Sequence, residues 1–261
     1  MKAIRPKPIL IFFLCLGLIA PAFPQSSAGD SSARVYQVNH WAAGAVCGVG
    51  LFANYMGISK LLGKYDLSLA EIQALDKRTL NKIDAWSLNQ DPTRRAVFEK
   101  YSDYTLWASI ALPFSLLADK RIRLNGLDMV MMFLETMSLT TNIYEWSALG
   151  PNFQNRIRPV AYYDQLSYDE RKTGHNRNSF YSGHVATAAA STFFMAKVYS
   201  DSHPGLGDDK YLVYAAALIP PLVLGLFRVK ALKHFPSDII VGLVVGALCG
   251  ILVPEIYRVK K

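Results

Sequence analysis

The fold is decided by a polar stretch that runs directly into an apolar one: Arg228-Val-Lys-Ala-Leu-Lys-His-Phe-Pro-Ser-Asp238, followed by Ile239–Ile256. The apolar part is close to the roughly 20 residues that an α-helix needs to cross the hydrocarbon core of a bilayer. Pro236 suits the first turn of that helix, because the N–H that proline lacks would have no helical partner there. The sequence thus predicts a membrane helix with a cluster of polar side chains at its first turn.

Five more apolar segments lie upstream and predict further helices: Trp41–Leu62, Tyr101–Ala118, Leu127–Leu149, His184–Tyr199 and Tyr211–Phe227. About half of the chain, 51%, is apolar, and these residues gather in segments instead of spreading evenly. Such clustering favours a polytopic membrane protein over a soluble globule. We therefore expect an all-α membrane bundle of about six helices. The first segment is interrupted by four glycines, so it either spans the membrane or packs against the bundle.

Basic clusters beside the apolar segments account for much of the net charge of +8. One cluster is Lys120–Arg123, and the other comprises Arg258, Lys260 and Lys261. Such clusters mark the cytoplasmic ends of membrane helices, and no basic stripe with interleaved aromatic residues indicates nucleic-acid binding. The loops at 150–181 and 228–236 then lie together on the outer face. We expect an integral protein of a bacterial inner membrane, with its functional face toward the periplasm and no nucleic-acid partner.

The N-terminal residues 1–25 have the layout of a secretory signal peptide or of an uncleaved anchor. A basic start precedes the apolar run Ile9–Ala20, and small and polar residues follow it. A cleaved signal would leave the following chain outside, and a spanning Trp41–Leu62 would then invert the topology. Either the signal is retained, or that segment does not span. We expect residues 26–100 to form an N-terminal helix and a polar amphipathic region, and residues 101–257 to form the core.

Three polar blocks lie at helix ends and contain the groups that a phosphate needs. They are Asn155-Arg-Ile-Arg-Pro159, Ser179-Phe-Tyr-Ser-Gly-His184 and the stretch from Arg228 to Asp238. The oxygens of a phosphate monoester require charge-assisted donors, and the planar guanidinium fork of arginine matches them best. Arg158 and Arg228 can supply two such forks, so we expect both to bind the phosphate.

The second and third blocks supply a nucleophile, a general acid and a backbone anion site. Ser182 and Gly183 precede the fourth helix, where backbone N–H groups can bind an anion and glycine permits close approach. A neutral His234 imidazole can attack phosphorus, and Asp238, one helical turn later, can take the proton of its other ring nitrogen. His184 remains as general acid for the leaving oxygen, and later as base for the water that hydrolyses the phosphohistidine. No cluster of His, Cys and carboxylate residues has the spacing of a zinc site.

These blocks resemble the three signatures of the type 2 phosphatidic acid phosphatase (PAP2) superfamily, which also includes the vanadium haloperoxidases. The family pattern is Lys-x6-Arg-Pro, Pro-Ser-Gly-His and Ser-Arg-x5-His-x3-Asp. It is matched here by Arg158-Pro159, by Ser182-Gly183-His184, and by Arg228, His234 and Asp238 at the required spacing. The resemblance covers roughly residues 100 to 257. It implies a six-helix membrane bundle, a mechanism without metal or cofactor, and substrates such as lipid phosphates or pyrophosphates.

The chain departs from this pattern at three positions. Pro151 stands where the family has its lysine, Tyr181 replaces the proline of the second signature, and Phe227 replaces the serine of the third. The loss of the lysine removes one cation from the phosphate site. Three basic residues of the same loop could take its place: Arg156, Lys172 and Arg177.

We therefore expect a membrane phosphatase that hydrolyses a phosphomonoester or pyrophosphate of a lipid-like substrate. Two alternatives keep the same fold: a vanadate-dependent haloperoxidase, and a non-catalytic lipid-binding or scaffold protein, which the change at Pro151 favours. A transporter is disfavoured, because the charged residues gather at helix ends instead of midway along the helices. The expected partners are the lipid phosphate and the bilayer.

Overall fold

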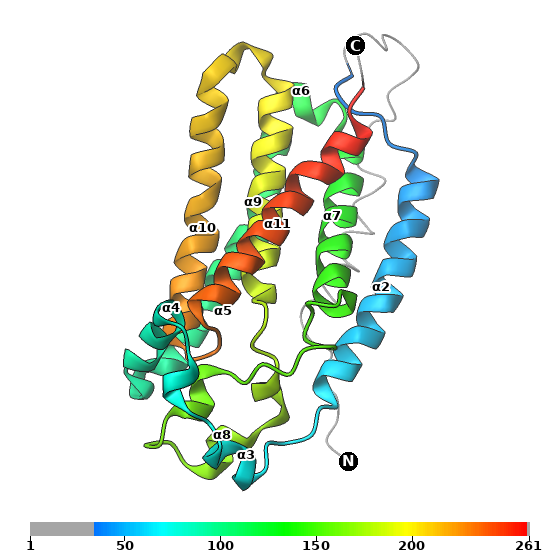
Figure 1. Ribbon diagram of the computed structural model, residues 1–261. Helices are drawn as coiled ribbons and strands as arrows, with labels where there is room; N and C mark the ends of the chain where they lie inside the picture. Colours follow the sequence, from blue (N-terminus) through cyan, green and yellow to red (C-terminus); the bar gives the residue numbers. More distant parts are fainter. Residues whose placement is uncertain (1–33, 260–261) are drawn as a thin grey trace.

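Six long helices form a bundle in the computed structural model, which describes residues 34–259 (Figure 1). They are α2 (His40–Leu62), α5 (Arg95–Ala111), α7 (Gly126–Trp146), α9 (Gly183–Ser202), α10 (Lys210–Lys230) and α11 (Pro236–Tyr257). Each overlaps one apolar segment of the sequence, although α5 begins ahead of the segment Tyr101–Ala118, whose last part forms a separate 3-10 helix (Leu112–Ala118). The described residues contain no strand beyond an isolated bridge between Tyr36 and Arg258. The prediction of an all-α bundle is therefore confirmed. The expected signal peptide or anchor at 1–25 lies outside the described residues.

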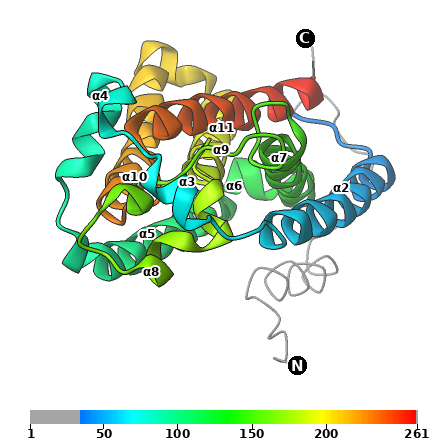
Figure 2. The ribbon, with the colours of Figure 1, turned by 60° about the horizontal axis from the view of Figure 1, so that its bottom comes forward.

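Helix α9 lies at the centre of the bundle. Viewed from one end in Figure 2, it is surrounded by α5, α7, α10 and α11, whereas α2 packs at the edge against α7. The alanines of α9 permit this position, because Ala186, Ala188, Ala189 and Ala190 are fully buried and let neighbouring helices approach closely. The N-terminus of α9, which carries the second polar block, therefore lies in the middle of one end of the bundle.

Glycines bring α11 directly against α9. A methyl group on Gly242 would lie 2.6 Å from the main-chain oxygen of Ser182, and one on Gly246 would lie even closer to the main-chain oxygen of Ala186. Small residues at four-residue spacing let two helix backbones touch in this way. The contact holds the first turn of α11 beside the first turn of α9, where the main-chain N–H of Ser182 donates to the main-chain oxygen of Asp238 over 3.1 Å.

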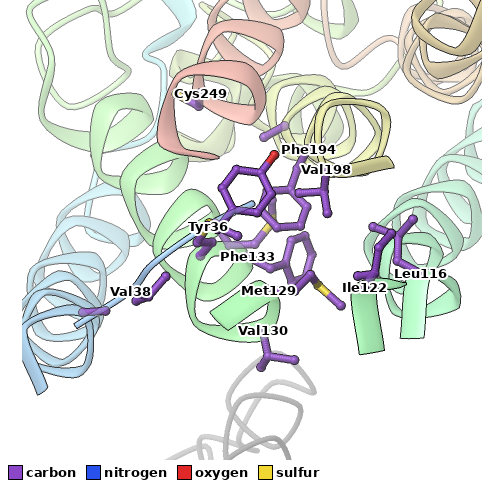
Figure 3. Packing of buried hydrophobic residues seen from close by; sticks show 14 residues of the cluster. Tyr36, Val38, Leu116, Ile122, Met129, Val130, Phe133, Phe194, Val198 and Cys249 are labelled. Atoms are coloured by element: carbon purple, nitrogen blue, oxygen red, sulfur yellow. The ribbon is translucent and has the colours of Figure 1, made fainter. Parts of the chain in front are cut away.

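A cluster of large apolar side chains fills the bundle toward the end away from the polar blocks (Figure 3). Phe133 of α7 contacts Phe114 and Phe194, with ring centroids 5.4 and 5.2 Å away. Tyr36 and Val38, which precede α2, belong to the same cluster. This packing fixes α7 against α9 and anchors the chain ahead of α2, so the opposite end of the bundle is left to the polar side chains.

Three of the described helical stretches are long and apolar enough to cross a membrane: α2, Pro204–Lys230, which includes α10, and α11. Exposed apolar side chains recur at every fourth residue along α11, at Ile240, Val244, Leu248, Leu252 and Ile256. An outward-facing apolar stripe of this kind suits contact with lipid. The chain is thus a polytopic membrane bundle, as its composition predicts.

The described residues of both basic clusters lie at the end of the bundle opposite to the polar blocks. Lys120–Arg123 forms α6, and Arg258 directly follows α11, whose last turn lies at the same end in Figure 1. Helix α2 begins at this basic end and finishes at the end of the polar blocks.

The polar region between α2 and α5 folds over the end of the bundle that holds the polar blocks. It contains the short helices α3 (Leu69–Gln73) and α4 (Lys82–Ala85). Leu67 and Ile72 are buried there against Ala161 of the loop that precedes α9. The amphipathic stretch therefore packs on the protein itself and helps to shape the loop that carries the first polar block.

Candidate active site

The five residues that the sequence singles out for phosphate chemistry meet at one end of the bundle. His184 lies in the first turn of α9, Arg228 in the last turn of α10 and Asp238 in the first turn of α11, while His234 and Arg158 lie in connecting loops. The charges of Arg228, Arg158 and His184 all act on the ring of His234. The fold thus joins residues from three separate blocks into one group.

His234 lies in the loop between α10 and α11 and is held there by the main chain. Its Nδ1 atom lies 2.6 Å from the main-chain oxygen of Ser179, so Nδ1–H donates to that carbonyl. Burial holds the pKa of His234 well below its ordinary value, and the charges of Arg228 and Arg158 lower it further. The ring is therefore neutral near neutral pH, and its other nitrogen, Nε2, keeps a lone pair.

Asp238 does not hold the ring of His234 directly, contrary to the prediction from their spacing. Its Oδ2 atom lies 3.8 Å from Nδ1 of His234 and instead accepts from Ser179 Oγ at 2.6 Å and from the Phe235 N–H at 2.8 Å. The spacing was misleading because α11 begins only at Pro236, so His234 precedes the helix and does not share its face. Asp238 positions His234 through Ser179, whose hydroxyl binds the carboxylate and whose carbonyl binds the ring.

A buried ionic network anchors Asp238 from another side. Arg156 donates to Oδ1 of Asp238 at 2.5 Å and to Oδ2 of Asp84 at 2.6 Å. Asp84 is completely buried and also accepts from the N–H and hydroxyl of Ser237, at 2.9 and 2.8 Å. Burial opposes ionisation of Asp84, but the hydrogen bonds from Ser237 and Arg156 outweigh it and lower its pKa. Arg156 is therefore engaged by two carboxylates.

The other two basic residues that could replace the missing lysine are also paired with carboxylates. Lys172 forms an ion pair with Asp169 at 2.5 Å, and Arg177 forms one with Glu71 at 2.8 Å. Both pairs lie on the short helices and loops that cover this end of the bundle. Each of the three suggested residues is thus already paired with a carboxylate.

Two arginines aim hydrogen-bond donors at this group. Arg228 is 4% exposed, and its Nη1 donates to Ser102 Oγ over 3.2 Å. Arg158 donates through Nε and Nη2 to the main-chain oxygen of Asn178, at 3.3 and 3.2 Å. Among the described residues, Nε of Arg228 and Oγ of Ser182 are buried without a hydrogen-bond partner. Because buried polar atoms without partners are costly, these two mark a place where an anion would be bound.

The N-terminus of α9 adds main-chain donors to the site. Its N-cap is Ser182, whose side chain makes no capping hydrogen bond, so no side-chain oxygen caps the first N–H groups of the helix. These groups carry partial positive charge and favour an anion. A methyl group on Gly183 would lie 3.0 Å from the ring of Tyr144, so a glycine allows the helix to begin this close to its neighbour.

One face of α5 completes the site with residues outside the three blocks. Asp103 Oδ1 lies 3.4 Å from Nε2 of His184, and Glu99 Oε1 lies 2.8 Å from Nζ of Lys233. Together with Ser102, these residues stand three and four positions apart, the spacing of one helix face. The side chains of His184 and Asp103 are 36% and 49% exposed, so this pair forms the part of the site that water reaches.

Reasoning from the sequence assigned no role to several of these residues. Ser179 lies inside the second block, so its position was indicated but its two contacts were not. Asp84, Glu99, Ser102 and Asp103 lie in helices far from any block, and an isolated polar residue in or near an apolar segment carries no signal of its own.

A known protein family matches the part of the chain that holds the three polar blocks. A family model described as the PAP2 superfamily matches residues 125–261, which include α7, α9, α10, α11 and all three polar blocks. A solved structure of a transmembrane PAP2-type phosphatidylglycerolphosphate phosphatase from Bacillus subtilis is 21% identical, over 82% of this chain and 94% of that chain, with a TM-score of 0.45. No curated protein matches the chain.

Proposed function

Because the chain belongs to the PAP2 superfamily, whose model matches residues 125–261, we propose that it hydrolyses a phosphomonoester or pyrophosphate of a lipid-like substrate through a phosphohistidine intermediate. Family membership supports a membrane phosphatase in general. The finer proposal is carried by one observation on His234. Its ring is neutral, is fixed at Nδ1 by the carbonyl of Ser179, and has the cations Arg228 and Arg158 beside it.

Binding of the phosphate uses the donors that the protein leaves unpaired. Arg228 Nε and Ser182 Oγ are buried without partners among the described residues, and an anion can accept from both. The guanidinium of Arg158 and the N-terminus of α9 add charge from the other sides. Because these groups are held before substrate arrives, they stabilise the charge that develops on the phosphoryl oxygens without reorganising.

In the first step, Nε2 of His234 attacks phosphorus. The N–P bond forms while the bond from phosphorus to the leaving oxygen breaks, and the electron pair of that bond stays on the oxygen. Protonated His184 gives its proton to this oxygen, so the leaving group departs as an alcohol or as a phosphate ester. Asp103 lies beside His184 and stabilises the protonated imidazole that this step requires.

In the second step, water attacks the phosphohistidine. His184, now neutral, takes a proton from the water, and the N–P bond breaks to release inorganic phosphate and neutral His234. The exposure of His184 and Asp103 supports this role, because the water must enter from their side. The two steps return the protein to its starting protonation state.

An apolar groove beside the site supports an amphiphilic substrate. A cavity of about 350 Å³ is lined by Ile83, Trp86, Leu226, Val229, Ile239 and Ile240. It therefore lies between α10, α11 and the region of α4, next to Arg228 in the chain. A hydrocarbon chain in this groove would leave its phosphate at the helix ends, where the polar residues stand.

Release of inorganic phosphate from a panel of lipid phosphates and pyrophosphates tests the proposal. The full chain in detergent is compared with His234→Ala and His184→Ala, and radiolabelled phosphate on the protein is sought after rapid quenching at alkaline pH. We expect His234→Ala to abolish both release and labelling, and His184→Ala to slow release strongly. Unchanged release by His234→Ala would exclude the nucleophile assigned here. No release by the wild type from any lipid would favour a non-catalytic lipid-binding protein.

A further inference from the structure

Lys233 directly precedes His234 in the tight loop between α10 and α11. Its main-chain N–H donates to the main-chain oxygen of Arg228 over 3.1 Å, and the preceding Leu232 is fully buried with a left-handed φ of 58°. A side chain as bulky as leucine adopts that backbone conformation only where its surroundings enforce it. The loop is therefore fixed in shape, and with it the starting point of the Lys233 side chain.

The ammonium group of Lys233 lies among the same charges as His234. Burial lowers the pKa of Lys233 most, and Arg158 and Arg228 lower it further, while Glu99 opposes them. Both arginines therefore act on Nζ. Geometry agrees, because Glu99, which binds Nζ at 2.8 Å, lies on the same face of α5 as Ser102, which accepts from Arg228, and Asp103, which pairs with His184. Lys233 lies inside the third block, but the sequence assigns it no role. Cations that lie close together repel one another, and an anion bound between them offsets this repulsion.

Lys64 approaches the place of the missing family lysine but is used by the protein itself. Its Nζ donates to the main-chain oxygens of Pro151 and Gln154, at 2.5 and 2.9 Å, and to Oδ1 of Asn155 at 2.9 Å. Three acceptors satisfy the three donors of an ammonium group. Lys64 is therefore a clamp on the loop that leads to Arg158, with no donor left for a substrate.

We propose that Lys233 binds the substrate phosphate as a third cation beside Arg158 and Arg228, and so supplies the charge that is lost at Pro151. The proposal rests on the phosphatase function proposed above. Without substrate, Nζ is held by Glu99, whose side chain is 42% exposed. Water can therefore solvate the Glu99 carboxylate when it leaves Nζ. A phosphate dianion that is already bound by two arginines therefore displaces Glu99 from Lys233.

The test measures the affinity of the full chain in detergent for orthovanadate, a tetrahedral oxyanion like phosphate. Binding is followed by calorimetry and, independently, by competitive inhibition of lipid phosphate hydrolysis. The variants are Lys233→Met, Lys233→Arg and Glu99→Gln. Lys230→Met is the matched control. Lys230 is the last residue of α10, just ahead of the loop that holds Lys233, but its Nζ lies over the ring of Phe98, 5.0 Å from the centroid.

Removing the ammonium group of Lys233 and removing the carboxylate of Glu99 should change the affinity for orthovanadate in opposite directions. Lys233→Met weakens orthovanadate binding by about tenfold or more, the usual worth of a charge-assisted hydrogen bond. Lys233→Arg retains most of the affinity because it keeps the charge. Glu99→Gln strengthens binding, because the competing carboxylate is gone. Lys230→Met binds as the wild type does.

Three results would overturn the proposal. Unchanged binding by Lys233→Met would mean that Lys233 does not touch the anion, and an equal loss in Lys233→Met and Glu99→Gln would mean that their ion pair only supports the fold. Failure of the phosphatase proposal is separately visible. Orthovanadate binding with the expected pattern but no phosphate release would reject catalysis and keep Lys233 as an anion-binding residue. Absence of orthovanadate binding by the wild type would reject the role of Lys233 as well.

Discussion

Ser179 and Asp238 are joined by a hydrogen bond of 2.6 Å from the serine hydroxyl to Oδ2, while the main-chain oxygen of the same serine accepts from His234. Asp238 thus acts on His234, the proposed nucleophile, through one intermediate residue. Ser179→Ala removes the hydroxyl that binds Asp238 but keeps the main-chain oxygen that binds His234. His234 thus keeps its hydrogen bond but loses the link to Asp238 that fixes its position. We expect kcat to fall roughly tenfold or more, because small displacements of a reacting group are costly, with little change in KM.

The matched control for Ser179→Ala is Ser191→Ala. Ser191 is also fully buried, and its hydroxyl donates to the main-chain oxygen of Ser109 over 2.6 Å, on the central part of α9. Both variants lose one buried hydrogen bond and should lose similar thermal stability. An equal fall of kcat in the two variants would show that the effect at Ser179 reports folding and not the position of His234.

Asp103 should set the upper pH limit of turnover. Its carboxylate lies 3.4 Å from Nε2 of His184 and, against burial and the charge of Arg228, favours the protonated ring that the proposed mechanism requires. Asp103→Asn removes that charge, so kcat should decline at lower pH than in the wild type. Asp119→Asn is the control, since Asp119 forms a similar pair with His203 at 3.0 Å at the opposite end of the bundle. A pH profile of kcat that is the same in Asp103→Asn and wild type would contradict the assignment.

Much of the fold was predictable because a bilayer leaves an apolar segment few choices. A run of apolar residues long enough to span must satisfy its own backbone hydrogen bonds, and it does so as a helix. The segment Ile239–Ile256 and α11 (Pro236–Tyr257) therefore nearly coincide. Composition does not show which helices pack against one another. Gly242 and Gly246 allow the contact with α9, yet the sequence does not name α9 as the partner.

In the candidate site too, the residues at helix ends were predictable, whereas those that depend on helix packing were not. His184, Arg228 and Asp238 were predictable because each lies at the end of a helix that the apolar pattern defines. Asp103 and Glu99 were not, because their contacts depend on how α5 packs beside α9 and α10. The direct bond from Asp238 to His234 was predicted wrongly, since a spacing of one turn implies a shared face only when both residues are inside the helix.

The contact between α9 and α11 predicts a sensitive glycine. A methyl group on Gly246 would strike the main-chain oxygen of Ala186, which cannot move as a side chain does. Gly246→Ala should therefore lower the stability by about 1–3 kcal/mol, the usual cost of overpacking, and reduce phosphate release by moving α11 relative to His184. Gly48→Ala on α2 is the control, because nothing lies within 4 Å of its added methyl group. Equal melting temperatures for the two variants would contradict this close packing.

His234 should make the protein less stable in mild acid. Its pKa is well below the ordinary value in the folded protein and returns to about 6.5 in the unfolded chain. As the pH falls below about 6.5, the unfolded chain takes up a proton that the folded protein does not, so the free energy of unfolding decreases. The melting temperature should therefore fall less in His234→Asn than in the wild type between about pH 7.5 and 5. An unchanged slope in His234→Asn would contradict the prediction.

Pro151→Lys tests whether the site still lacks a cation. Pro151 is buried, and its main-chain oxygen accepts from Nζ of Lys64 at 2.5 Å, so a lysine at 151 would stand beside another ammonium group. If Lys233 already supplies the third cation, we expect no gain in kcat/KM and a lower melting temperature, because a charge is added to a buried position near another cation. Pro151→Met is the matched variant, since it also removes the proline ring but adds no charge. A severalfold rise of kcat/KM in Pro151→Lys, absent from Pro151→Met, would show that the place of the family lysine is open and that Lys233 does not fill it.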